Sequence, residues 1–233
     1  MSELKYKRVL LKISGEAFGD AGGIDFQKVN EIAELIVEIR KEGAQIAIVN
    51  GAGNLFRGSN QGKSIDREQA DYIGMVATIM NSLALKAILK EKNIPVSLYS
   101  AWEIKGFLPG FDSERAQKDF EDGQVVISTA GTGKPFFTTD TAGVQRAVDL
   151  GCDLMVKAST VDGVYSDDPK MDDDAQRFDQ ISYEEVLKND LKILDRSAVE
   201  IAKEHRLKII VSLFSKESIL SALRGDEIGT LIS

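Results

Sequence analysis

Short apolar runs alternate with helical patterns along the whole chain, and this alternation restricts the fold more than any other feature. The runs have the length and β-branched character of buried strands. They cover residues 8–13, 44–49, 94–99, 124–128, 154–157, 209–213 and 229–232. Helical patterns cover residues 25–43, 64–92, 114–120, 142–150, 183–188, 197–204 and 216–223. Such alternation is typical of a largely parallel sheet with helices on both faces, so the sequence predicts an α/β protein.

Length and charge narrow the class of protein further. A chain of 233 residues suits one large α/β domain, which we expect to cover residues 1–233. The formal charge of −8 argues against a nucleic-acid-binding surface and against a basic membrane patch, but a few local donors still suffice for a nucleotide. The single cysteine, Cys152, is unable to form an internal disulfide, and Met1–Arg8 lacks the apolar core of a signal peptide. We therefore expect a cytoplasmic protein.

The longest apolar segment, Ile73–Leu89, contains several polar residues, so it is not expected to span a membrane. Its apolar residues recur at helical spacing, which predicts a helix that is either buried or turned toward an interface. They are Ile73, Val76, Met80, Leu83 and Ala87.

The loop that follows the run at 125–127 has the parts of a phosphate or anion cradle. Gly131 and Gly133 free the backbone, and Thr138, Thr139 and Asp140 are all able to cap the next helix, whose free N–H groups attract negative charge. A Walker A loop is excluded, because Ser128 and Pro135 occupy positions that need Gly and Ser or Thr. An ordinary strand-to-helix loop is the alternative interpretation.

Two other predicted strands also end in glycine turns. Lys12 lies near the end of the first strand and precedes Ser14–Glu16, where it faces either an anion or solvent. The second strand is followed by Gly51, Ala52, Gly53 and then Arg57, a pattern that suits a backbone cradle with a bidentate phosphate partner. Asp71 near the start of the long helix either complements the helix dipole or contacts a ligand.

Some kinds of site are excluded or disfavoured by the composition. His205 is the only histidine, so neither a Ser-His-Asp triad nor a multi-histidine metal site is available. The aspartate-rich run 167–174 lacks the glycine and glutamate of an EF-hand and is expected to be a solvated acidic loop. Cys152 is expected to be a small buried residue.

In its motifs and their order, the whole chain resembles the bacterial uridylate (UMP) kinases of the amino acid kinase superfamily. The motifs are Lys12–Ala17, Gly53–Gly58, Asp71–Met75, Gly131–Asp140, Val161–Tyr165 and Gly229–Ile232. The resemblance implies a three-layer α/β/α sandwich with a mostly parallel central sheet. It also implies transfer of the γ-phosphoryl group of MgATP to UMP in pyrimidine nucleotide biosynthesis, with Mg²⁺ carried on the ATP phosphates rather than on a protein site. The expected assembly is a homohexamer, and the expected effectors are GTP and UTP. Neither a membrane nor a nucleic acid is expected as a binding partner.

The resemblance also assigns roles to individual residues. The implied catalytic residues are Lys12, Arg57 and Asp140, with Asp140 orienting Lys12 or neighbouring donors. The implied ATP-binding residues are Lys12, Ile13, Ser14, Gly15, Gly53, Arg57, Ser159, Tyr165 and Asp168. The implied UMP-binding residues are Ala52, Asp71, Thr132, Gly133, Lys134, Pro135, Phe136, Phe137, Thr138 and Thr139. The N-terminal part of the domain would thus hold mainly the UMP site and the oligomer contacts, and residues 140–233 mainly the ATP site.

Two features depart from the family pattern. Ala52 stands where the family usually has a third glycine, which is tolerable if its φ is negative. The segment Gly19–Gly23 is shorter than in relatives in which it takes part in GTP activation. Two alternative functions also stay open: a related kinase that phosphorylates a carboxylate or carbamate, and a non-catalytic nucleotide sensor. The pair Phe136–Phe137 and Asp71 favour a nucleoside monophosphate as acceptor, and intact Lys12, Arg57 and Asp140 favour retained chemistry.

Overall fold

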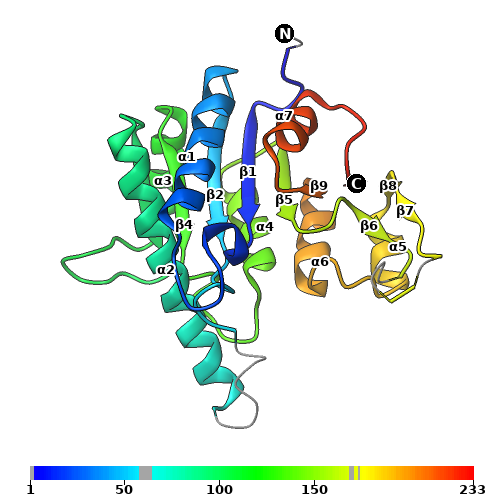
Figure 1. Ribbon diagram of the computed structural model, residues 1–233, viewed down its shortest axis with the longest axis horizontal. Helices are drawn as coiled ribbons and strands as arrows, with labels where there is room; N and C mark the ends of the chain where they lie inside the picture. Colours follow the sequence, from blue (N-terminus) through cyan, green and yellow to red (C-terminus); the bar gives the residue numbers. More distant parts are fainter. Residues whose placement is uncertain (1–2, 58–64, 168–170, 173) are drawn as a thin grey trace.

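A central eight-stranded sheet organises the molecule, in the strand order β3-β4-β2-β1-β5-β9-β10-β8 (Figure 1). The computed structural model describes residues 3–57, 65–167, 171–172 and 174–233. The strands of this sheet are β1 (Arg8–Ile13), β2 (Gln45–Asn50), β3 (Val96–Ser100), β4 (Val125–Thr129), β5 (Leu154–Ser159), β8 (Gln180–Ile181), β9 (Lys208–Leu213) and β10 (Thr230–Ile232). All neighbouring pairs are parallel except β9 and β10. A separate antiparallel pair joins β6 (Val164–Tyr165) to β7 (Arg177–Phe178).

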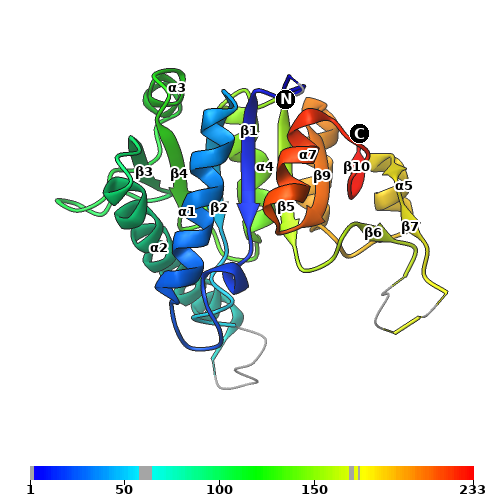
Figure 2. The same cartoon turned by 45° about the horizontal axis from the view of Figure 1, so that its top comes forward.

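Helices cover both faces of the sheet, which gives three layers. One face carries α1 (Phe26–Lys41), α2 (Arg67–Glu91) and α7 (Lys216–Arg224), whose apolar side chains share one core cluster. The other face carries α3 (Ser113–Glu121), α4 (Thr139–Asp149), α5 (Tyr183–Lys188) and α6 (Arg196–His205), which share the second cluster. Figure 2 shows α1 and α7 in front of the central strands and α4 behind them. The predicted α/β/α sandwich with a mostly parallel sheet is confirmed.

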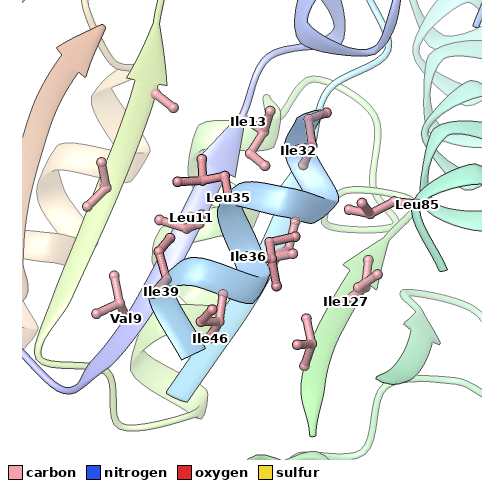
Figure 3. Packing of buried hydrophobic residues seen from close by; sticks show 14 of the residues in the cluster. Val9, Leu11, Ile13, Ile32, Leu35, Ile36, Ile39, Ile46, Leu85 and Ile127 are labelled. Carbon is pink, nitrogen blue, oxygen red and sulfur yellow. The ribbon is translucent and has the colours of Figure 1, made fainter. Parts of the chain in front are cut away.

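Alternation along β1 decides which side chains reach each core. Val9, Leu11 and Ile13 point toward α1 and join its Ile32 and Ile36 (Figure 3). Each of these five side chains is fully buried, which contributes about 1.5–3 kcal/mol per residue. Leu10 and Lys12, two of the even-numbered residues of β1, lie on the opposite face, since successive strand residues alternate. Lys12 is therefore turned toward the layer that contains α4.

The predicted elements agree with the structure to within a few residues at each end. Asp25 caps α1 as predicted, accepting a hydrogen bond from the Gln27 N–H at 2.8 Å. The pattern at 64–92 corresponds to α2, which Asp66 caps, while residue 64 lies outside the described residues. The sequence did not indicate η1 (Gly15–Phe18), β6, β7 or β8, because such short elements carry no measurable periodicity and these four, unlike β10, do not lie in an apolar run.

The apolar stripe of α2 is only partly covered. Ile73, Val76 and Met80 are 42%, 53% and 50% exposed, so these residues are not buried within the chain. The opposite side of the helix, including Leu85 and Leu89, is buried in the core. Within the described ranges α2 is also the one helix that is long and apolar enough to cross a membrane, judged by length and composition alone, but half of its most apolar window is buried inside the protein.

Candidate active site

A buried cluster of two lysines and one aspartate lies at the carboxyl ends of the central strands. The Lys12 ammonium lies 2.8 Å from Oδ1 of Asp140, and Lys157 Nζ donates a hydrogen bond to Oδ2 of the same carboxylate at 2.6 Å. Lys12 is 8% exposed and Asp140 is 7% exposed. One carboxylate therefore holds two cations in a region with little water. The contact agrees with the expectation that Asp140 orients Lys12, whose catalytic role stays a prediction.

The fold brings these three residues together from distant parts of the sequence. Lys12 and Lys157 are direct register partners on the parallel strands β1 and β5, so both side chains leave the sheet on the same face. Asp140 lies in the first turn of α4, which packs on that face. Thr138 caps this helix by accepting a hydrogen bond from the Asp140 N–H at 3.0 Å. The predicted cap at the start of α4 is thus confirmed.

Burial and charge oppose each other at this cluster. Burial raises the pKa of Asp140, but Lys12 and Lys157 outweigh this effect and hold the pKa below its usual range. For Lys157 the balance is reversed: burial and the neighbouring Lys12 lower its pKa, although Asp140 and Asp195 act in the opposite direction. The aspartate is therefore a stable anion at neutral pH, and it serves as the counter-charge for both lysines.

The two glycine turns after β1 and β2 pack backbone against backbone beside this cluster. A Cβ on Gly15 would lie 2.2 Å from the Gly53 nitrogen, a distance that no side chain permits. Glycine at position 15 is therefore required by close approach. Ala52 is 8% exposed and is not among the non-glycine residues with positive φ in the described chain. The alanine that departs from the family pattern thus fits its turn without strain.

Arg57 is held by Glu16 at the edge of these turns. Its guanidinium makes an ion pair with Glu16, and its Nε donates to the Gly53 carbonyl at 3.1 Å. Burial raises the pKa of Glu16, but hydrogen bonds from its own N–H and from Ser14, with the charges of Arg57 and Lys12, produce a net lowering. Both side chains are about half exposed, so solvent weakens the pair and leaves the arginine available to another anion.

A cavity of about 370 Å³, here named the central cavity, opens onto Lys12 and the two glycine turns. Of the predicted site residues, those that line it are Lys12, Ser14, Gly15, Ala52, Gly53, Asp71, Thr132, Lys134, Phe137, Thr138 and Thr139. Some predicted ATP-side residues therefore meet UMP-side residues around one space, whereas Arg57, Gly133, Pro135 and Phe136 are not among the residues that line it. The side chain of Ile13 is fully buried in the core, which leaves only its backbone to contact a ligand.

Asp71 reaches from α2 to the loop at 130–138. Its Oδ2 accepts a hydrogen bond from the Phe136 N–H at 2.7 Å, and Arg67 lies 3.9 Å from the same oxygen. The Arg67 guanidinium also lies over the Phe136 ring, 5.3 Å from its centroid. Asp71 is thus not only a helix-dipole residue, since its carboxylate lines the central cavity and holds the backbone of the loop.

A second cavity of about 440 Å³, here named the lateral cavity, lies between residues 161–167 and 189–193. Tyr165 lines it and donates a hydrogen bond to Oδ1 of Asp162 at 2.7 Å. Ser159 ends β5, two residues before the first residue of the lining, and Asp168 lies outside the described residues, as does part of the acidic run. Lys157 Nζ also donates to the Ile193 carbonyl, and Ile193 lines this cavity. Lys12 thus lines the central cavity, while Lys157 is hydrogen-bonded to a residue that lines the lateral cavity.

A larger groove of about 710 Å³ lies elsewhere, between α1 and the start of α7. Its charged side chains neutralise one another, with Glu38 lying 3.1 Å from Lys41 and 3.4 Å from Lys216. None of the predicted site residues that the structure describes lines it. Among the described residues there is also no group of three or more His, Cys, Asp or Glu side chains that could hold a metal ion.

Three residues of this region were not identified from the sequence. Lys157 shares the signal that marked Lys12, a lysine within an otherwise apolar central strand. Asp195 caps α6 and accepts hydrogen bonds from Thr138 and from Thr141, the latter at 2.7 Å. Trp102 donates a hydrogen bond to the Gly133 carbonyl at 2.9 Å. Only Lys157 carried a usable signal, because the other two contacts depend on the tertiary fold.

These features together describe an α/β protein with a phosphate-type site that lacks a Walker A loop. They are the mostly parallel sheet, the glycine turns and the buried Lys–Asp–Lys cluster. The model of the amino acid kinase family matches residues 7–212, and the chain belongs to this family. Its relatives include a uridylate kinase of Hyphomonas neptunium, which is 43% identical over 100% of this chain and 94% of the relative.

Two solved structures share the fold over nearly their whole length. The UMP kinase of Bacillus anthracis has a TM-score of 0.93 and 34% identity, covering 98% of this chain and 96% of its own. The UMP kinase of Ureaplasma parvum has a TM-score of 0.90 and 33% identity, covering 99% and 100%.

Proposed function

We propose that this chain is a UMP kinase, which transfers the γ-phosphoryl group of MgATP to UMP and gives UDP and ADP in pyrimidine nucleotide biosynthesis. The observation that carries this proposal is the buried cluster of Lys12, Asp140 and Lys157, in which Lys12 lines the central cavity and Lys157 is hydrogen-bonded to Ile193 of the lateral cavity. A phosphoryl group transferred between nucleotides in these cavities would pass beside the two ammonium groups. The uridylate and UMP kinases among the relatives support the same activity.

The chemistry needs positioning and charge stabilisation more than it needs a base. The transferred group spreads negative charge over its oxygens in the transition state, and preorganised cations lower its energy. Lys12 would supply such a cation, with its orientation fixed by Asp140. The acceptor is a phosphate oxygen that is already ionised at neutral pH, so the transfer needs no histidine as a base, and a chain with a single histidine suits it.

The two nucleotides are assigned to the two cavities. UMP would occupy the central cavity, with Asp71 at the ribose and residues 132–139 around the rest of the nucleotide. ATP would extend from Tyr165 in the lateral cavity to the backbone of Gly15 and Gly53, with Arg57 released from Glu16 to grip phosphate. In this arrangement residues 140–233 hold mainly ATP.

Mg²⁺ fits this site only as part of MgATP. Asp140, the buried carboxylate of the cluster, is engaged with two lysines, so it is not free as a dedicated ligand. When bound to the ATP phosphates, Mg²⁺ would neutralise part of their charge.

An ADP-release assay with a panel of acceptors tests the proposal directly. The panel contains UMP, CMP, dUMP, AMP, and small carboxylates with carbamate, which represent the alternative kinases of the family. We expect UMP-dependent release of ADP and little release with the carboxylates. Release that is fastest with a carboxylate or carbamate would identify the alternative kinase. Nucleotide binding without release by any acceptor would identify a non-catalytic sensor.

Replacement of Asp71 by alanine is expected to weaken UMP binding by at least tenfold. The change removes a carboxylate at the proposed ribose site and releases the Phe136 N–H that it holds at 2.7 Å, and hydrogen bonds to charged groups contribute about 1.5–3 kcal/mol. Calorimetric titration with UMP measures the effect, and ATP affinity serves as the internal control. Unchanged UMP affinity would indicate that Asp71 does not contact UMP and only complements the dipole of α2.

We further propose a cytoplasmic homohexamer that uses the exposed stripe of α2 as one subunit contact. Val76 and Met80 are about half exposed, and together with Ile73, Leu55 and Phe56 they line an apolar groove. Light scattering is expected to give six times the chain mass of 25.5 kDa, and Val76→Lys is expected to produce smaller species. A monomeric mass for the unsubstituted protein would contradict this proposal. Addition of GTP or UTP to the kinase assay tests whether these nucleotides are effectors.

A further inference from the structure

The loop at residues 130–138, here named the acceptor loop, has an unusual backbone. Ala130 and Phe136 have φ values of 62° and 71°, in the left-handed region that non-glycine residues rarely adopt. Gly131 and Gly133 also have positive φ values, of 58° and 76°. Such conformations persist only where surrounding contacts fix them. The shape of the acceptor loop must therefore depend on groups outside it.

Three side chains outside the loop hold its backbone. Thr78 Oγ1 accepts a hydrogen bond from the Ala130 N–H at 2.8 Å, and Asp71 accepts one from the Phe136 N–H at 2.7 Å. Both residues belong to α2. The third is Trp102, whose Nε1 donates to the Gly133 carbonyl at 2.9 Å. Trp102 lies in the segment that follows β3, so the middle of the loop is tied to a different element from its two ends.

The contact between Trp102 and Gly133 is closely fitted. A Cβ at position 133 would lie 2.8 Å from Trp102 Nε1 and 3.0 Å from the Ala101 methyl group. The Trp102 ring also contacts Tyr72, with centroids 6.1 Å apart, and Tyr72 is adjacent to Asp71 in α2. The indole is partly buried against the core, which fixes its orientation. Its N–H is thus a preorganised donor aimed at one carbonyl group.

Gly133 connects this donor to the central cavity. The residues on either side of it, Thr132 and Lys134, both line that cavity, and Thr132 Oγ1 accepts a hydrogen bond from the Lys134 N–H at 3.2 Å. Trp102 itself is not among the described residues that line the central cavity. We propose that Trp102 is a positioning residue for the acceptor nucleotide, which holds Gly133 so that Thr132 and Lys134 face the UMP phosphate and sugar. This inference rests on the proposed UMP kinase function.

The expected effect falls on UMP rather than on ATP. A loop that is already held in its binding conformation loses less freedom when the ligand binds, so the loss of one anchor lowers affinity. Removal of this partly buried hydrogen-bond donor is expected to raise the KM for UMP about tenfold. The KM for ATP should change less than twofold, because the contact is made to the UMP-side loop alone.

Exchange of a single atom tests the proposal without disturbing the packing. Trp102 is the only tryptophan, so residue-specific incorporation of β-(3-benzothienyl)alanine replaces its N–H with sulfur and alters no other position. The measured quantities are the KM values for UMP and ATP in the ADP-release assay and the unfolding temperature. Phe107→Ala, at an exposed position of the same segment, is the matched control and should leave the KM for UMP unchanged.

The natural protein provides an independent readout. Because Trp102 is the sole tryptophan, its fluorescence reports on the Gly133 contact, and we expect UMP alone, but not ATP alone, to change the emission. A KM for UMP within twofold of normal after the N–H is removed, or an equal rise in the KM for ATP, would overturn the inference. If the unsubstituted protein fails to phosphorylate UMP, the proposed function and this inference fall together. If the unsubstituted protein phosphorylates UMP and the substituted protein has the same KM for UMP, the inference alone falls.

Discussion

Replacement of Lys12 by alanine is expected to lower kcat about 10³-fold while UMP still binds. Lys12 is the cation that lines the central cavity from β1, and the buried carboxylate of Asp140 holds it 2.8 Å away. Loss of one preorganised electrostatic group typically costs about 10²–10³ in kcat, and a full positive charge in a dry site belongs at the upper end. Because the group acts mainly in the transition state, kcat should fall far more than UMP affinity.

Two measurements separate this role from a general loss of structure. Calorimetric titration of Lys12→Ala with UMP should give an affinity within a few-fold of normal. Lys41→Ala, which removes an exposed lysine from the end of α1, should keep full activity. A Lys12→Ala protein with near-normal turnover would show that the ammonium group has no part in phosphoryl transfer. The cluster of Lys12, Asp140 and Lys157 would then be purely structural.

Local patterns in the sequence were sufficient to predict the sheet and one part of the cluster. The apolar run at 8–13 and the glycine turn after it predicted a strand at whose end Lys12 faces either an anion or solvent, and Lys12 lines a cavity at that point. A helix cap among Thr138, Thr139 and Asp140 was predicted because hydroxyl and carboxylate side chains favour this position, and the cap is Thr138. These predictions succeeded because the signal and its consequence lie within a few residues of each other.

Contacts that depend on sheet register could not be predicted in the same way. Lys157 lies 145 positions after Lys12, and only the parallel pairing of β1 with β5 makes the two residues neighbours. The ion pair of Arg57 with Glu16 and the contact of Trp102 with Gly133 likewise join turns that follow different strands. A single sequence contains no signal for such pairings, since each lysine alone fits an apolar strand and each of the other residues alone fits an ordinary loop. Strand order and register, which only the fold supplies, determine them.

The second large effect is expected from Asp140→Asn, which should reduce both stability and activity. The amide would leave the ammonium groups of Lys12 and Lys157 buried side by side without their shared counter-charge. Removal of one partner from a buried ion pair costs about 3–5 kcal/mol of unfolding free energy. Asp149→Asn breaks a pair of similar length on the same helix, at 2.6 Å from Arg146, but with its carboxylate 35% exposed. That control should cost about 0–1 kcal/mol.

The pH dependence distinguishes this loss of charge from a simple packing defect. Burial raises the pKa of Asp140, but the two lysines lower it by more than burial raises it. The pKa in the folded protein therefore lies below its ordinary value. Its contribution to stability is therefore complete above the ordinary carboxyl range and is lost as the pH falls through the lowered pKa. Urea unfolding should show the largest difference between the natural protein and Asp140→Asn near neutral pH, and a smaller one in acid. A difference that is the same at every pH would mean that the carboxylate charge does not hold the two lysines.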